Sequence, residues 1–243
     1  ILGRLVGSEM CIRDRPKSSN AFNTIMSEEL TSLIEDLSMS SDNIRSIILT
    51  GSGEKAFCAG GDLKERNGMS DDDWKKQHLV YERMIRALIR CPIPIIGAIN
   101  GAAFGGGCEI AAALDFVYVS ENAKFALPEL GLGIIPGAGG TQTLSRAVGE
   151  RRAKELILTG RVFTAQEAVK WNLANDIFPV DKLLDETIKI AELISSKAPI
   201  AVKQAKQSIH KGLQMSLSDG LSFEIEAYNR TIPTKDRIEG VLA

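Results

Sequence analysis

The residues best suited to chemistry in this chain include two glutamates in apolar surroundings. Glu109 stands at the start of a predicted helix that continues with Ile, Ala, Ala, Ala and Leu, and Glu129 follows a proline in a loop flanked by leucines. A carboxylate in such surroundings needs a partner or a chemical role. Ordinary alternatives stay open for both: Glu109 as a dipole-stabilised acid or the partner of a buried arginine, and Glu129 as a cap for the next turn.

Two glycine-rich turns could bring backbone N–H groups to the same place. Residues 105–107 are three glycines between a predicted strand and a predicted helix, and Gly61 lies in a similar turn after an earlier strand. Without Cβ atoms, a ligand can approach the unpaired amides at a helix start. The amides of Gly106 and Gly61 are therefore predicted donors to an oxygen that becomes negative during a reaction. Tight strand–helix packing remains the alternative for either turn alone.

Two acids beside two such donors would support proton transfer next to a carbonyl group. Other chemistries have less support. The chain has no G-x-x-x-x-G-K-[ST] motif, and its triple glycine lacks the spacing of a dinucleotide-binding turn. Its cysteines show no CxxC spacing, so no metal site is predicted. The side chains of the chain that could serve as soft metal ligands are those of Cys11, Cys58, Cys91, Cys108, His78 and His210.

Composition points to an ordinary globular protein. The 243 residues suit one large domain with a terminal appendage, and no apolar run reaches the length of a bilayer span. The formal net charge of -2 and the absence of lysines interleaved with aromatic residues disfavour nucleic acid as a partner. Cys58 and Cys108 are expected to be small buried fillers, and reduced thiols indicate an intracellular setting.

The elements that must position these residues alternate between helix and strand. An α/β core followed by a helical extension is predicted, with strands confined to the first two thirds of the chain. An amphipathic helix follows Asn20, with Ser27 as its expected N-cap. Thr164 and Glu167 form a predicted capping box, and the last third is expected to be all helical. Other expected strands are residues 47–49, 95–99, 116–119 and 124–127; other expected helices are residues 72–90 and those starting near Asp181, Pro199 and Ser216.

Three blocks of the sequence together resemble the crotonase (enoyl-CoA hydratase/isomerase) superfamily. They are residues 56–63 (AFCAGGDL), residues 105–109 (GGGCE), and residues 128–129 with 135–142 (PE and IPGAGGTQ), in the order of the family's signatures. The resemblance runs from Arg15 to Ala243. It implies a core of ββα turns wound into a spiral, with C-terminal helices that assist formation of a trimer or a dimer of trimers. It also implies an acyl-CoA substrate and no separate cofactor.

The same resemblance divides the chain. Residues 1–14 show neither strand alternation nor the regions of a signal peptide, and are interpreted as a non-native segment in place of the family's opening strands. Residues 15–180 are the expected spiral core. Residues 181–243 are the expected C-terminal helical region, which ends earlier than is usual in the family.

Residue roles also follow from the resemblance. Gly61 and Gly106 would donate their amides to the thioester oxygen, with Glu109 as base and Glu129 as acid. The amide of Gly137 would help to hold the water, and the acyl tail would lie against residues 66–84. The implied contacts to coenzyme A are Lys55, Ala59, Asp62 and Lys64.

The presence of both glutamates favours hydration, since isomerases of the family usually retain only the acid matching Glu129. The predicted reaction is reversible addition of water to a trans-2-enoyl-CoA, giving a 3-hydroxyacyl-CoA, in fatty-acid or branched amino-acid breakdown. Residues 231–240 resemble the C-terminal block of methylglutaconyl-CoA hydratases, a narrower alternative. An enoyl-CoA isomerase and an RNA-binding or inactive scaffold are the others. The expected compartment is the bacterial cytoplasm or the mitochondrial matrix.

Overall fold

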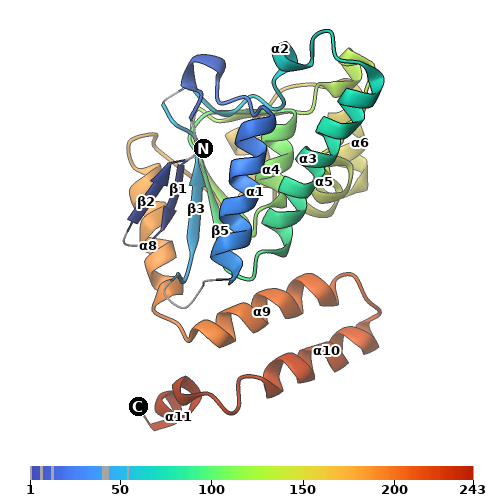
Figure 1. Ribbon diagram of the computed structural model, residues 1–243. Coiled ribbons are helices and arrows are strands. Elements are labelled where there is room, and N and C mark those ends of the chain that lie inside the picture. Colours follow the sequence, from blue (N-terminus) through green and yellow to red (C-terminus); the bar gives the residue numbers. More distant parts are fainter. Residues whose placement is uncertain (1, 6–7, 12–13, 40–43, 54, 243) are drawn as a thin grey trace.

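A computed structural model describes residues 2–5, 8–11, 14–39, 44–53 and 55–242. Its strands form two sheets, with strand orders β10-β7-β5-β3-β1-β2 and β4-β6-β8-β9 (Figure 1). The strands of the larger sheet are β1 (Leu2–Leu5), β2 (Ser8–Cys11), β3 (Ile47–Thr50), β5 (Ile95–Ile99), β7 (Phe116–Ser120) and β10 (Asp176–Phe178). Those of the smaller sheet are β4 (Ala56–Cys58), β6 (Ala102–Phe104), β8 (Lys124–Ala126) and β9 (Phe163–Thr164).

Consecutive strands alternate between the two sheets. The chain passes from β3 to β4, from β5 to β6 and from β7 to β8, and each step leaves the larger sheet for the smaller one. β3, β5 and β7 are parallel to one another in the larger sheet, as are β4, β6 and β8 in the smaller one, and helical segments follow each pair. This repeated ββα path confirms the predicted spiral.

Helices cover both faces of the larger sheet. In Figure 1, α1, α3 and α4 lie on one side and α8 on the other. Ile47 and Leu49 belong to the main core, whereas Ile48 packs with Leu183 and Ala191 of α8, as the two-residue period of a strand requires. The helices are α1 (Thr24–Met39), α2 (Leu63–Arg66), α3 (Asp71–Arg90), α4 (Gly106–Ala113), α5 (Gly140–Val148), α6 (Glu150–Thr159), α7 (Ala165–Lys170), α8 (Leu183–Ser195), α9 (Pro199–Gly212), α10 (Leu217–Asn229) and α11 (Lys235–Leu242), with 3-10 turns η1 (Pro16–Ser18) and η2 (Glu129–Leu132).

Several local predictions are confirmed. Thr164 and Glu167 form the capping box of α7, Pro199 is the first residue of α9, and Ser216 caps α10. The thiols of Cys58 and Cys108 are fully buried, and burial raises the pKa of Cys58 to about 11. These two residues are the small fillers that the sequence predicted.

The predicted N-cap of α1 was wrong. Ser27 lies inside the helix, buried, and its hydroxyl donates to the carbonyl oxygen of Asn23 at 2.9 Å. Asn23 is the cap, since its Oδ1 accepts the amide of Met26 at 3.0 Å. A serine can bond back to the preceding turn as well as cap a helix, so the residue type alone does not distinguish the two positions.

Two predictions about where strands occur were also wrong. The last third of the chain contains β9 and β10, and β10 pairs in parallel with β7 at the edge of the larger sheet. Both strands are too short to show alternation. From residue 183 onward the described elements are helical, which agrees with the predicted start of the helical region near Asp181.

The first residues also form strands. β1 pairs antiparallel with both β2 and β3, with Leu2 opposite Thr50 and Leu5 opposite Ile47. Backbone pairing of this kind needs an exposed edge, here that of β3, more than it needs alternating side chains. The non-native origin proposed for residues 1–14 stays a prediction.

The C-terminal helices α9, α10 and α11 lie below the sheets in Figure 1. Lys206 on α9 ties them to the core by an ion pair with Asp115 at 2.6 Å and a hydrogen bond to the carbonyl oxygen of Ile93 at 2.9 Å. Within the described part of the chain, no helix combines the length and apolar character needed to cross a membrane.

Candidate active site

The first glycine turn, residues 59–62, follows the end of β4 and is fixed by two backbone hydrogen bonds to Phe22. The amide of Phe22 donates to the carbonyl oxygen of Gly60, and the amide of Asp62 donates to the carbonyl oxygen of Phe22, both at 2.9 Å. Gly60 has a φ of 92°, a conformation that favours glycine. The Gly61 amide between these two bonds donates to no group among the described residues.

The second glycine turn leads into α4. The amide of Gly105 donates to the carbonyl oxygen of Ala126 at 2.9 Å, and its own carbonyl oxygen accepts the amide of Glu109 at 3.0 Å. A Cβ on Gly107 would stand 2.0 Å from the carbonyl oxygen of Cys58, so α4 lies directly on β4. Gly106 is the first residue of the helix, and its amide too has no acceptor within the described chain.

The two turns touch each other. A Cβ built on Gly60 would lie 2.9 Å from the amide nitrogen of Gly106. The rings of Phe22 and Tyr81 pack against Gly106 and Gly61, with their centroids 4.7 Å apart in a T-shaped contact. The two predicted donor amides, of Gly61 and Gly106, therefore lie in adjacent turns that both pack against the rings of Phe22 and Tyr81, here called the aromatic floor.

Glu109 projects from the first turn of α4 and is 3% exposed. Its Oε1 accepts the amides of Ala138 at 2.8 Å and Gly140 at 2.7 Å, which fastens the second glycine-rich loop to α4. The pKa of Glu109 is raised to about 7: burial is the largest cause, the Glu129 charge adds to the rise, and the hydrogen bonds from the two amides oppose it. The partner is thus a pair of backbone amides, and no arginine among the described residues pairs with it.

Glu129 begins η2 and is 8% exposed. Its Oε2 is buried without a hydrogen-bond partner in the described structure, and its Oε1 lies 2.9 Å from where a Cβ on Gly105 would stand. Burial raises the pKa of this carboxyl above its ordinary value. Among the described residues, the Glu129 side chain caps no helical turn, contrary to the alternative left open by the sequence. Its Oε2 is therefore a buried acceptor that is left without a donor.

These groups share one cavity of about 1320 Å³. Gly61, Gly106, Glu109, Glu129 and Gly137 all line it, so the structure brings together every predicted catalytic, oxyanion and water-positioning residue. Helix α3 forms much of another wall and overlaps the segment 66–84, whose contact with the acyl tail remains a prediction. The wall residues from α3 include Trp74, His78, Tyr81 and Ile85.

The predicted contacts to coenzyme A are brought together less completely. Ala59 lines the cavity, whereas Lys55, Asp62 and Lys64 are not part of its wall. Asp62 is engaged elsewhere: one oxygen pairs with Arg15 at 2.6 Å and the other accepts the amide of Lys64 at 2.9 Å. Contacts to coenzyme A by these three residues remain predictions.

Arg66 and His78 fall in the segment predicted to contact the acyl tail, but sequence reasoning gave neither of them a role in the site. The imidazole of His78 packs against Gly137, where an added Cβ would lie 2.4 Å from its Cε1. Nothing in the sequence sets this histidine apart from a surface residue of an amphipathic helix. Among the described residues, no cluster of three histidine, cysteine or acidic side chains could hold a metal ion.

The raised pKa values predict how activity depends on pH. If Glu109 must be ionised to take a proton from water, activity should rise with pH up to about 7 and then level off. If Glu129 must be protonated to deliver a proton, its raised pKa keeps the acid form available at higher pH than an exposed glutamate would, and activity should fall again above that pKa. We expect a bell-shaped profile of kcat/KM, measured with a 2-enoyl thioester from pH 5 to 9. A profile flat below pH 7 would contradict the role of Glu109.

Comparisons with known proteins agree with one another. Residues 10–243 match the family model described as enoyl-CoA hydratase/isomerase. A solved enoyl-CoA hydratase from Bacillus anthracis superimposes with a TM-score of 0.92 and 45% identity, covering 94% of this chain and 88% of that one. The short-chain-enoyl-CoA hydratase of Clostridium acetobutylicum is 40% identical over 95% of this chain and 88% of its own length. The mitochondrial enoyl-CoA hydratase of Pongo abelii is 40% identical over 95% and 78%.

Proposed function

Because the chain belongs to the enoyl-CoA hydratase/isomerase family, we propose that it adds water to the double bond of a 2-enoyl-CoA, giving a 3-hydroxyacyl-CoA. One observation carries this proposal: two buried carboxyls with raised pKa values line the same cavity as two free backbone amides. Relatives named as hydratases support the same reaction.

The chemistry follows from where charge moves. Gly61 and Gly106 donate to the thioester oxygen, which draws electron density from the double bond and makes the β carbon electrophilic. Glu109 takes a proton from water as its oxygen bonds to the β carbon, and Glu129 delivers a proton to the α carbon. The oxygen that gains enolate character stays between the two amides, and each such donor stabilises a transition state by roughly 3 to 4 kcal/mol. The acid and base labels exchange when the reaction runs backward.

The position of the water is part of the proposal. Oε1 of Glu109 is occupied by two amides, so its other oxygen is left to face a ligand. Oε2 of Glu129 lacks a partner, and a water between the two carboxyls, also held by the Gly137 amide, would supply one. The substrate brings coenzyme A with it, so the proposed reaction uses no further cofactor.

The direct test uses crotonyl-CoA. Hydration removes the conjugation of the double bond with the thioester, so the ultraviolet absorbance of the conjugated system should fall when protein is added. A 3-enoyl-CoA offered in parallel tests isomerisation, which would make the conjugated absorbance appear instead. Turnover of the 3-enoyl substrate alone would overturn the hydratase proposal in favour of the isomerase alternative.

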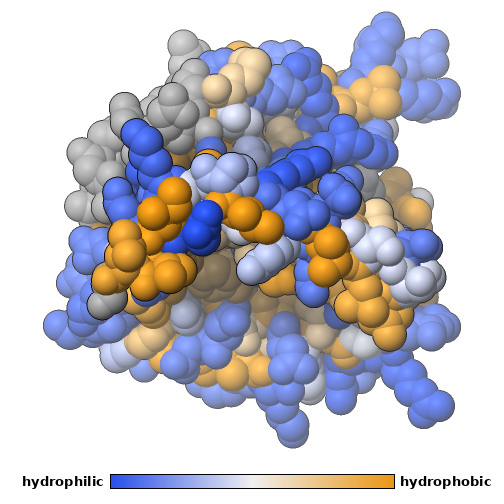
Figure 2. Space-filling model, turned by 90° about the horizontal axis from the view of Figure 1, so that it is seen from below, coloured by the Kyte–Doolittle hydropathy of each residue, from blue (hydrophilic) through white to orange (hydrophobic). Residues whose placement is uncertain are grey.

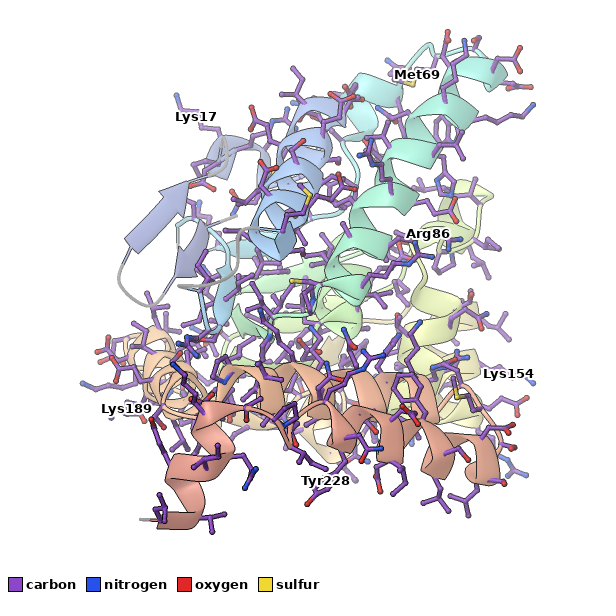
Figure 3. The ribbon with its side chains drawn as sticks, turned by 60° about the horizontal axis from the view of Figure 1, so that its bottom comes forward. Lys17, Met69, Arg86, Lys154, Lys189 and Tyr228 are labelled. Carbon is purple, nitrogen blue, oxygen red and sulfur yellow. The ribbon has the colours of Figure 1, made fainter. Side chains whose placement is uncertain are left out.

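A homotrimer, or a dimer of trimers, belongs to the same proposal. Leu217, Leu221, Ile225 and Tyr228 recur at helical spacing along α10, and each is at least 53% exposed. Figure 2 shows hydrophobic residues gathered among polar ones on the side of the molecule formed by the C-terminal helices, and Figure 3 shows Tyr228 pointing away from the fold. A continuous apolar stripe of this kind is typical of a surface covered by another chain.

The assembly is tested by changing that stripe. Leu221→Lys together with Ile225→Lys is expected to convert the assembly to a species of one chain mass, 26.3 kDa, in light scattering after gel filtration. The matched control is Glu226→Lys, which reverses a charge at an exposed residue of the same helix that lies about 100° or more around the helix axis from each residue of the stripe. This variant should keep the larger mass. An unchanged mass in the double variant would exclude α10 from the interface.

The cellular setting is proposed on the relatives alone. They include a bacterial and a mitochondrial protein, which supports an intracellular site of action.

A further inference from the structure

The imidazole of His78 extends from α3 to Gly137 in the wall of the active-site cavity. His78 is half-buried and lines the same cavity as Glu109 and Glu129. A Cβ built on Gly137 would lie 2.4 Å from Cε1, 3.0 Å from Nε2 and 3.5 Å from Nδ1 of the ring. The ring therefore lies directly against Gly137, and a side chain does not fit between them. The proposed reaction gives His78 no role.

This contact reaches the loop that holds the proposed base. Gly137 lies in the loop before α5, and Oε1 of Glu109 fixes that loop by accepting the amides of Ala138 at 2.8 Å and Gly140 at 2.7 Å. Gly137 is therefore the neighbour in sequence of a residue that is bonded to the base. His78 consequently joins α3 to the part of the cavity where the carboxyl of Glu109 lies.

Ile85 makes a second contact between α3 and the same loop. It is 3% exposed, belongs to the main core, and its Cγ2 lies 3.7 Å from where a Cβ on Gly139 would stand. His78 and Ile85 are seven positions apart on α3, close to two turns of helix, so they face the loop from the same side of α3. Core packing at Ile85 closes the inner end of the space between α3 and the loop, and the half-buried His78 occupies the outer end.

The proposed reaction brings the acyl tail to this space. Water held by Glu109, Glu129 and the Gly137 amide bonds to the β carbon, so the β carbon lies within a few bond lengths of Gly137. The carbons that follow it start between the inner end at Ile85 and the outer end at His78. A tail that stops soon after the β carbon needs little of this space, whereas a longer tail needs the volume that the imidazole fills.

We propose that His78 limits the length of the acyl group, so that the preferred substrates are 2-enoyl-CoA thioesters with short acyl chains. This inference rests on the proposed function of the site and narrows its substrate class. Removing the ring should admit longer tails, because apolar surface that could receive them is present in the same cavity. The apolar side chains that line the cavity and are more than half exposed include Leu79, Leu132 and Ile135.

A chain-length series measures this limit. The ratio of kcat/KM for trans-2-decenoyl-CoA to that for crotonyl-CoA is expected to be below about one tenth in the wild type and to rise at least about tenfold in His78→Ala. Equal kcat/KM values in the wild type would overturn the role of His78 and leave the hydratase proposal standing. A ratio that stays the same in His78→Ala would overturn it too.

Binding tests the same limit without turnover, so its result does not depend on the proposed reaction. Butyryl-CoA and decanoyl-CoA are saturated and cannot be hydrated. In calorimetry the wild type is expected to bind decanoyl-CoA no more tightly than butyryl-CoA, although the additional methylene groups would strengthen binding if the cavity buried them. His78→Ala should shift the ratio of the two dissociation constants at least about tenfold in favour of decanoyl-CoA. Clearly tighter binding of decanoyl-CoA by the wild type would refute the inference.

Matched variants show whether the volume of the ring is the cause. His78→Phe keeps a ring beside Gly137 and should keep the limit, whereas His78→Ser removes the ring, keeps a polar side chain and should relax the limit as His78→Ala does. His78→Ser also replaces the alanine variant if that one does not fold. Leu79→Ala removes bulk from the next residue of α3, which lines the cavity and is 63% exposed, and should leave both ratios unchanged. If His78→Phe or Leu79→Ala relaxed the limit as much as His78→Ala, the inference would be refuted.

Discussion

Glu109→Gln and Glu129→Gln are each expected to lower the rate of crotonyl-CoA hydration at least about 100-fold. Glutamine keeps the size of the side chain and its carbonyl oxygen, so in Glu109→Gln the amides of Ala138 and Gly140 can still be bound. What is lost is the ability to accept or deliver a proton. The loss should therefore appear in kcat, measured by the fall in conjugated absorbance, with a smaller change in KM.

The same substitutions should not weaken the fold, which separates a chemical role from a structural one. A carboxyl with a raised pKa contributes stability that is fully present below its ordinary pKa and is lost as the pH rises through the pKa in the folded protein. For Glu109 this window runs from 4.5 to about 7, equivalent to roughly 3 kcal/mol. Glu109→Gln is expected to melt at a higher temperature than the wild type at pH 8, with the difference shrinking toward pH 4. Full activity in either variant, or a lower melting temperature at pH 8, would contradict these roles.

The residues of the candidate site could be picked out from the sequence because each has a strong local signature, and the structure places them around one cavity. Gly61 and Gly106 lie in turns where a strand runs into a helix, and the peptide geometry of such turns exposes amides whatever the rest of the chain does. Glu109 was identified by the apolar helix around it, which makes an unpartnered carboxylate costly. What local reasoning left open was the partner, since Ala138 and Gly140 are distant in sequence and meet Glu109 only through the spiral.

Arg66 and His78 could not be predicted in the same way. Arg66 lies in a segment whose polar sequence is typical of an exposed loop. It is buried because its guanidinium packs against the rings of Trp74 and Tyr81, which belong to α3. A hydrophobic pattern identifies α3 as an amphipathic helix, but its rotation about its axis, and hence which polar residues face the cavity, is fixed by tertiary contacts. The candidate catalytic groups of this site therefore lie in local turns that the sequence identifies. The other residues of the cavity wall depend on how the helices pack over those turns.

Two edge strands, β1 and β10, were also not predictable from the local sequence pattern. β1 has no side-chain alternation that would predict a strand, yet it pairs with β3 along four residues. β10 is three residues long and joins the larger sheet beside β7. In both cases the hydrogen-bonding edge of an existing strand decides the outcome, and that edge exists only once the sheet has formed.

Gly106→Ala is the second change expected to have a large effect, although it adds only one methyl group. Its Cβ would stand 2.4 Å from Cζ of Phe22, a ring that is 2% exposed and packed against Tyr81. Because the ring cannot retreat, the start of α4 must move, and the Gly106 amide moves with it, away from the position proposed for the thioester oxygen. Loss of one such donor lowers kcat by about 100-fold to 1000-fold.

Gly61→Ala provides the matched control, because it adds the same methyl group to the other donor. Its Cβ would meet Cε2 of Tyr81 at 3.3 Å and Cε2 of Phe22 at 3.8 Å, contacts that a shift of a few tenths of an ångström relieves. The Gly61 amide should keep its place, and kcat with crotonyl-CoA should stay within about tenfold of the wild type. If the two alanine variants lost activity equally, crowding of the aromatic floor would explain the loss. A large difference between them, with both variants folded by circular dichroism, ties the rate to where the Gly106 N–H points, because the added methyl group is the same in each.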